Sequence, residues 1–139
     1  MHNMKYILAI ALVLGFHYSF AQNKSEEAEF LEESYITYKL AGDGIDTKGK
    51  MKSMKKAIQR IALARDTSAI EVLLDVYIGY DATDNDVKEL AYITLLKFKP
   101  EIFPKLNLRI ENAAYKYGIQ RNMHTDYMDL LALKKKLTP

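Results

Sequence analysis

Apolar residues recur every three or four positions along most of the chain, and short polar connectors interrupt this pattern at intervals. The spacing gathers apolar side chains on one side of an α-helix, so the sequence predicts a set of amphipathic helices. We expect six of them after residue 24. In chain order they cover about residues 25–40, 50–64, 68–80 and 86–98, then run from Glu101 or Pro104 to Tyr117, and finally from a cap at Thr125 to Lys136.

Residues that stop helices lie between these segments. Asp66 breaks the second helix, and Pro100 stops the fourth because it lacks the N–H group that a helix interior needs. Gly118 is expected to supply the left-handed position that ends the fifth helix. The lysines at 134–136 place cations where the carbonyl end of the last helix favours them.

The third helix has the widest apolar surface. Ser68 and Glu71 have the spacing of a capping box, in which each side chain bonds to a free backbone amide at the helix start. Two apolar stripes follow, and Glu71 and Asp75 are its only charged residues. We therefore expect this helix to be packed on more than one side.

The six helices form three pairs, whose first helices begin near residues 25, 68 and 101. These intervals bracket the repeat length of an α-solenoid, a stack of helical pairs in which each pair covers the apolar face of its neighbour. The expected fold class is therefore all-α, with three stacked antiparallel hairpins.

The middle pair resembles a known repeat. Residues 84–95 read Asp-Asn-Asp-Val-Lys-Glu-Leu-Ala-Tyr-Ile-Thr-Leu, which resembles the second helix of a HEAT repeat, with its Asp, Val-Arg/Lys, Ala and small-plus-Leu positions. Residues 69–74 are similar to the first helix of that repeat, so the resemblance covers about residues 68–98. The flanking pairs match in periodicity alone. The resemblance implies an α-α superhelix that binds other macromolecules along its surface.

Residues 1–21 have the three parts of a secretory signal peptide. After a short positive start comes an eleven-residue apolar run at 6–16, and Ser19 and Ala21 provide the small residues that a signal peptidase requires. Cleavage would leave Gln22 as the new N-terminus. The alternatives, an uncleaved core helix or a membrane anchor, are less favoured because spanning a bilayer takes about 20 apolar residues. We expect an exported protein, periplasmic or secreted.

The expected mature chain, residues 22–139, has room for a single helical domain. Cleavage removes Lys5 and no acid, which leaves 19 basic residues against 18 acidic ones, so no overall charge favours a polyanionic partner. The chain contains no cysteine. An exported form is therefore held together by packing and without disulfides.

Several kinds of catalytic site are excluded by composition. His124 is the one histidine after cleavage, so neither a zinc site of Cys and His ligands nor a Cys–His pair can form. A Ser-His-Asp triad would need His124, which we expect in a solvent-facing loop, and the chain has no nucleophile elbow. We assign no catalytic residue, no metal and no cofactor.

Two stretches come close to ligand-binding motifs. Residues 44–51 nearly match the phosphate-binding GxxxxGK(S/T) loop, but Met51 replaces the hydroxyl residue that holds magnesium. Asp81, Asp84 and Asp86 lie close together, but the glycine and the closing glutamate of an EF-hand are missing. We interpret the first stretch as a plain loop between helices and the second as helix-capping carboxylates.

Charge is unevenly distributed over the first two helices. Residues 47–65 contain seven Lys or Arg and no acid, whereas residues 26–33 contain five Glu and no base. Either the two helices face each other with complementary charges, or the charges are simply solvated, or the basic side binds an anionic partner. The candidate binding residues are Lys52, Lys55, Lys56 and Arg60, with two tyrosines outside the main apolar stripes, Tyr92 and Tyr115, which a neighbouring repeat could equally cover.

These patterns favour a non-catalytic protein-interaction module of the bacterial cell envelope. Its partner would be an envelope protein or an anionic glycolipid, and we expect no nucleic acid and no stable membrane span. The alternative is a carrier that binds a small apolar ligand between helices. A carrier should have a cavity lined by tyrosines and methionines, whereas an interaction module should have a filled core and an exposed patch. A hydrolase has only dispersed Asp and Glu residues in its favour.

Overall fold

A computed structural model describes residues 24–41, 47–79, 85–119 and 124–139. Within these ranges the chain forms six α-helices, one short 3-10 helix and no strand. The helices are α2 (Glu26–Ala41), α3 (Thr47–Ala64), η2 (Thr67–Ala69), α4 (Ile70–Gly79), α5 (Asn85–Leu96), α6 (Ile102–Ile119) and α7 (His124–Leu137). The all-α class and the six predicted helices are confirmed. The expected signal peptide at 1–21 lies outside the described residues.

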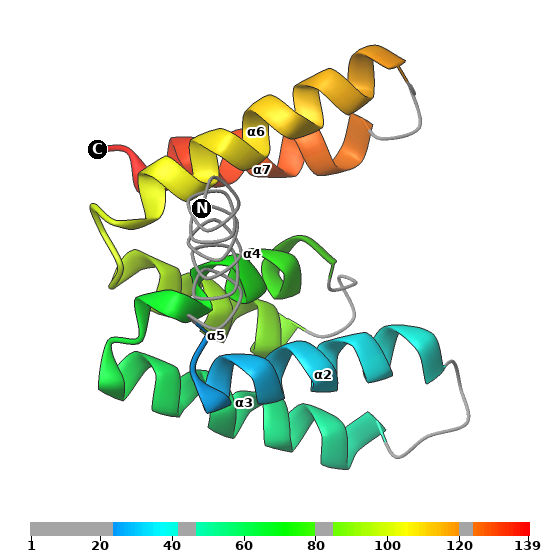
Figure 1. The fold of residues 1–139 in the computed structure, drawn as a ribbon, viewed down its shortest axis with the longest axis vertical. Coiled ribbons are helices and arrows are strands. Elements are labelled where there is room, and N and C mark those ends of the chain that lie inside the picture. The colour runs from blue at the N-terminus through cyan, green and yellow to red at the C-terminus, as the bar shows by residue number, and fades with distance from the viewer. Residues whose placement is uncertain (1–23, 42–46, 80–84, 120–123) are drawn as a thin grey trace, which may run out of the picture.

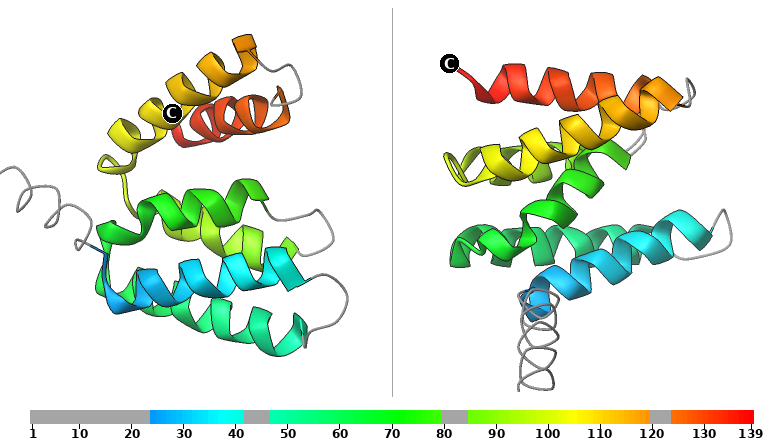
Figure 2. Two further views of the ribbon diagram at one scale, coloured as in Figure 1. Left: turned by 45° about the vertical axis from the view of Figure 1, so that its right-hand side comes forward. Right: turned by 45° about the horizontal axis from the view of Figure 1, so that its top comes forward.

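Consecutive helices pack against each other in pairs, and the pairs are stacked (Figure 1). α2 packs against α3, α4 against α5, and α6 against α7. The views in Figure 2 place α4 and α5 between the other two pairs. α3 packs on α5, while α4 contacts α2 on one side and both α6 and α7 on the other. No helix in the described ranges is long and apolar enough to cross a membrane.

α4 is buried on several sides, as its wide apolar surface predicts. Six of its ten residues are buried, namely Ile70, Val72, Leu73, Leu74, Val76 and Tyr77. They belong to one apolar core to which every helix of the stack contributes. Since the chain has no cysteine, this burial is the main source of cohesion.

The start of α4 differs from the predicted capping box. Asp66 is the N-cap of η2, which leads into α4, and its side chain accepts hydrogen bonds from the Ser68 backbone N–H at 3.1 Å and from the Ser68 hydroxyl at 2.6 Å. Ser68 lies within η2. Its hydroxyl accepts a hydrogen bond from the Ser25 backbone N–H at 3.0 Å, and the Ser25 hydroxyl donates to Asp66. The predicted capping box was wrong because the Ser68 hydroxyl bonds to the backbone of Ser25, which is remote in the sequence.

Two helix ends also correct the predictions. α6 continues through Gly118 to Ile119, so Gly118 is helical and does not supply a left-handed stop. α7 begins at His124, one residue before the expected cap at Thr125, which places His124 in a helix instead of a loop.

A residue with a left-handed backbone conformation directly follows the end of α3. Arg65 has a φ angle of 49°. The backbone N–H of Asp66 donates to the Ile61 carbonyl at 3.0 Å, and that of Arg65 donates to the Ala62 carbonyl at 3.2 Å. These two bonds form a Schellman motif. The predicted break at Asp66 is therefore confirmed, with Arg65 in the position that glycine usually takes.

Alanine substitutions at Gly118 and Gly79 should have opposite effects on stability. Gly118→Ala should raise the free energy of unfolding by about 0.5–1 kcal/mol, because the helix loses a flexible residue and a Cβ atom there meets nothing within 4 Å. Gly79→Ala should lower it by about 1–3 kcal/mol, because a Cβ atom would lie 1.6 Å from the Tyr35 hydroxyl oxygen. Urea unfolding followed by circular dichroism measures both changes, and equal responses would contradict this packing.

Candidate functional site

The basic residues predicted on the second helix divide into two groups. Lys55 forms an ion pair with Asp86 of α5 at 3.1 Å, and Arg60 pairs with Glu27 of α2 at 3.3 Å. The Arg60 pair fits the interpretation that the acidic and basic helices complement each other. Lys52 and Lys56 are exposed and form no ion pair with any described residue.

The unpaired lysines belong to a continuous exposed face of α3. We call this face the α3 strip, and it consists of Lys48, Lys52, Lys56, Gln59 and Leu63. Residues three or four apart on a helix are surface neighbours, so the five side chains follow one another along α3. Leu63 is 89% exposed, which gives the strip an apolar end beside its three cations.

The two candidate tyrosines lie on other helices. Tyr92 of α5 is half-buried, with its ring centroid 6.1 Å from that of Tyr77 and with the Lys136 ammonium 5.5 Å from the ring centroid. Neighbouring elements therefore cover part of it. Tyr115 of α6 is 72% exposed. The six predicted residues thus occupy three different helices and are not gathered into one site.

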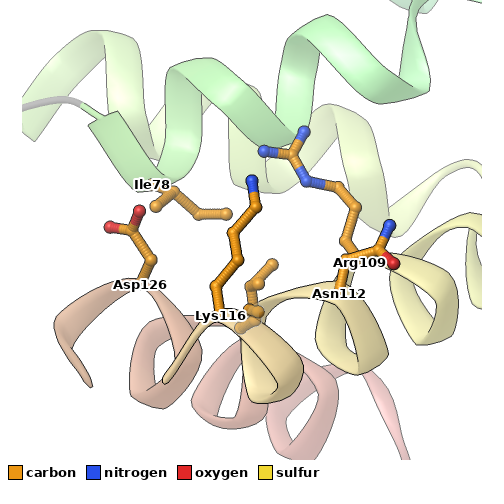
Figure 3. Close-up of a pocket in the computed structure, with 7 residues that line it drawn as sticks. Ile78, Arg109, Asn112, Lys116 and Asp126 are labelled. Atoms are coloured by element: carbon orange, nitrogen blue, oxygen red, sulfur yellow. The ribbon is translucent and has the colours of Figure 1, made fainter. Parts of the chain in front are cut away.

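A second candidate site was not predicted. A pocket of about 260 Å³ opens between α4, α6 and α7 (Figure 3), and we call it the α4–α6–α7 pocket. It is lined by Ile78 of α4, by Arg109, Asn112, Ala113 and Lys116 of α6, and by Asp126 and Leu130 of α7. The spacing of its polar α6 residues, three and then four positions apart, was a visible signal of a polar helix face.

Arg109 fastens the third helix pair to the middle one at the edge of this pocket. Its Nη1 atom lies 2.6 Å from Asp75 Oδ1 and 3.5 Å from Glu71 Oε2, and it donates to the Glu71 backbone carbonyl at 3.2 Å. Charge-assisted hydrogen bonds of this kind are stronger than neutral ones. The two acids are one helical turn apart on α4, so a single guanidinium reaches both.

Lys116 and Asp126 have no such partners. Both side chains line the pocket and are exposed, and neither forms an ion pair with a described residue. In Figure 3 the Lys116 ammonium extends toward α4 between Asp126 and Arg109. The pocket therefore contains a cation and an anion that form no ion pair with the described residues.

Tyr35 brings α2 to the same group of charges. Its phenol packs against Gly79 at the end of α4. Burial raises the pKa of Tyr35 above its ordinary value of 10.0, and the negative charges of Asp75 and Asp126 raise it further, while Arg109 opposes the shift. The Tyr35 phenol therefore stays protonated and neutral, and it packs between the first and middle helix pairs.

The two near-motifs fall partly outside the described ranges. Asp81 and Asp84 lie outside them, and Asp86 is in the first turn of α5, paired with Lys55. In residues 44–51, the last five positions belong to α3 and form helix instead of the expected loop, while the first three are outside the described residues. The described residues contain no group of three His, Cys, Asp or Glu that could hold a metal ion.

Comparison of the chain with protein-family models, with curated proteins and with solved structures gave no match. No relative therefore assigns a role to the α3 strip or to the α4–α6–α7 pocket.

Removal of the Arg109 charge should destabilise the stack. Arg109→Met leaves Glu71 and Asp75 partly buried beside a neutral side chain, and we expect the free energy of unfolding to fall by about 1.5–3 kcal/mol. Arg65→Met is the matched control, because it breaks an exposed pair of 3.8 Å with Glu101. The control should lose less than about 1 kcal/mol in the same urea titration. Equal losses would contradict the special role of Arg109.

Proposed function

We propose that this chain is an exported, non-catalytic helical-repeat protein that binds an acidic envelope protein along the α3 strip. The observation that carries the proposal is the row of three exposed lysines on one face of α3, of which Lys52 and Lys56 were candidate binding residues from the sequence. The proposed architecture is a HEAT-like stack of three antiparallel hairpins.

The charge arrangement of α3 supports a binding role. Like charges four residues apart on a helix repel one another and cost a few tenths of a kcal/mol per pair. Lys48, Lys52 and Lys56 form two such pairs, and no described acid offsets them. An acidic partner removes this repulsion on binding. The exposed Leu63 at the end of the strip adds an apolar contact.

The packing of the core favours an interaction module over an apolar-ligand carrier. Met54 is fully buried and Tyr77 nearly so, and both belong to the common core. Neither tyrosine nor methionine lines the α4–α6–α7 pocket, the hollow beside Ser25 and Arg60, or the hollow at the end of α7. A carrier of an apolar ligand needs a cavity lined mainly by apolar and aromatic side chains.

Burial along α5 supports the HEAT-like part of the proposal. Val87, Ala91 and Leu95 are the positions that carry the sequence resemblance, and each is fully buried. Thr94, the small residue of the motif, is buried as well, and its hydroxyl donates to the Leu90 carbonyl at 2.8 Å.

Export predicts a mature protein that begins at Gln22. Expression of the full chain in a bacterial host, followed by intact-mass measurement of the envelope fraction, should yield residues 22–139. Ala21→Arg should block the cleavage, because the peptidase requires a small residue at that position. Phe20→Leu is the matched control and should be processed normally. A full-length protein that stays in the cytoplasm would refute export.

Binding through the α3 strip predicts a specific response to charge reversal. Mature protein is crosslinked in envelope extract, and the crosslinked residues are identified by mass spectrometry. The parent should crosslink an acidic protein through α3, and the double variant Lys52→Glu/Lys56→Glu should lose this product. Raised salt should weaken the capture, because exposed charges are screened.

The control for this experiment is Lys97→Glu/Lys135→Glu, which makes the same change in net charge at two exposed lysines elsewhere. It should retain the partner. If both double variants lose it equally, net charge and not the α3 strip is responsible. If the parent crosslinks no protein but binds vesicles that contain a phosphorylated glycolipid, the partner class is wrong.

A further inference from the structure

The α4–α6–α7 pocket has features that the proposed function does not use. Most of its lining comes from α6 and α7, which lie at the opposite end of the stack from α3 (Figure 1), and none of its lining residues belongs to the α3 strip. Arg109 is neutralised by the acids of α4, whereas Lys116 and Asp126 form no ion pair with any described residue. The apolar part of its lining comes from Ile78 of α4, Ala113 of α6 and Leu130 of α7.

The charges around the pocket disfavour a ligand with a single charge. A simple anion attracted by Lys116 would also be repelled by Asp126, and a simple cation attracted by Asp126 would be repelled by Lys116. A ligand that carries both charges can satisfy Lys116 and Asp126 together.

The size of the pocket limits the ligand. Its volume of about 260 Å³ is below the range of about 300–1,000 Å³ that is typical of pockets for larger organic ligands. At about 30 Å³ for each water molecule, the space corresponds to roughly nine waters. A molecule of the size of a single amino acid fits these limits.

We propose that the α4–α6–α7 pocket binds a free α-amino acid with an apolar side chain. The carboxylate contacts the Lys116 ammonium and the side-chain amide of Asn112, and the ammonium contacts Asp126. The apolar side chain lies against Ile78 and Leu130. Because exposed ion pairs contribute at most about 1 kcal/mol each, binding is weak and needs both charges together.

The test uses the mature protein and defined small molecules. L-leucine, L-valine and L-methionine are titrated into the millimolar range in a buffer free of amino acids, and binding is followed by chemical-shift changes in the NMR spectrum. At least one should bind, with the largest shifts around the pocket. N-acetyl-leucine lacks the ammonium and leucinamide lacks the carboxylate, so each should bind several-fold more weakly than leucine, by up to about fivefold for the loss of about 1 kcal/mol.

Charge-neutral variants identify the groups responsible. Lys116→Gln and Asp126→Asn should each weaken amino-acid binding by up to about fivefold, while Lys135→Gln and Asp129→Asn, on α7 outside the lining of the pocket, should not. Thermal unfolding confirms that all four variants are folded.

Three results would overturn the proposal. The first is that none of the three amino acids binds. The second is that leucinamide or N-acetyl-leucine binds as tightly as leucine, since one charge would then suffice. The third is unchanged binding in folded Lys116→Gln and Asp126→Asn. None of these results affects the α3 strip, because that site is tested with a protein partner and different variants.

Discussion

Contacts made by α4 hold the three helix pairs together. α4 packs against α5 within its own pair, against α2 of the first pair, and against α6 and α7 of the third. A short helix can do this because apolar residues occupy most of its circumference. Each fully buried aliphatic side chain contributes about 1.5–3 kcal/mol. In a chain without cysteine, a polar substitution on any inward face of α4 therefore weakens more than one interface.

Apolar burial is not directional, and polar contacts at two points of α4 fix how the neighbours lie on it. At its start, Asp66 and Ser68 bond to Ser25 and so align α2. In its middle, Arg109 reaches Asp75 and the Glu71 carbonyl and so aligns α6. The partners in these networks are about 40 residues apart in the chain. The bonds that cross between helices are tertiary links, although Asp66 also caps η2 locally.

This distinction explains which features could be predicted. The helices and the many-sided burial of α4 follow from periodicity, which is a local property of the sequence. The capping box failed because Ser68 bonds to Ser25 and Glu71 faces Arg109. The prediction that Gly118 ends the fifth helix was wrong because a glycine near a helix end does not by itself fix where the helix stops.

The two candidate sites could be predicted to different degrees, because the sequence displays local composition and not tertiary contacts. The basic composition of α3 is visible in the sequence, but the paired state of Lys55 depends on Asp86, which arrives from another helix pair. The α4–α6–α7 pocket needs three helices to meet, and only its α6 face has a spacing that the sequence displays.

The described ion pairs separate cations that hold the fold from cations that are available to partners. Lys55, Arg60 and Arg109 each form an ion pair with an acid on another helix, so their charges are offset within the chain. Lys52, Lys56 and Lys116 lack such pairs among the described residues. Exposed charges contribute little to stability, so these three can change without loss of the fold. They are therefore the residues to vary when the proposed binding is tested.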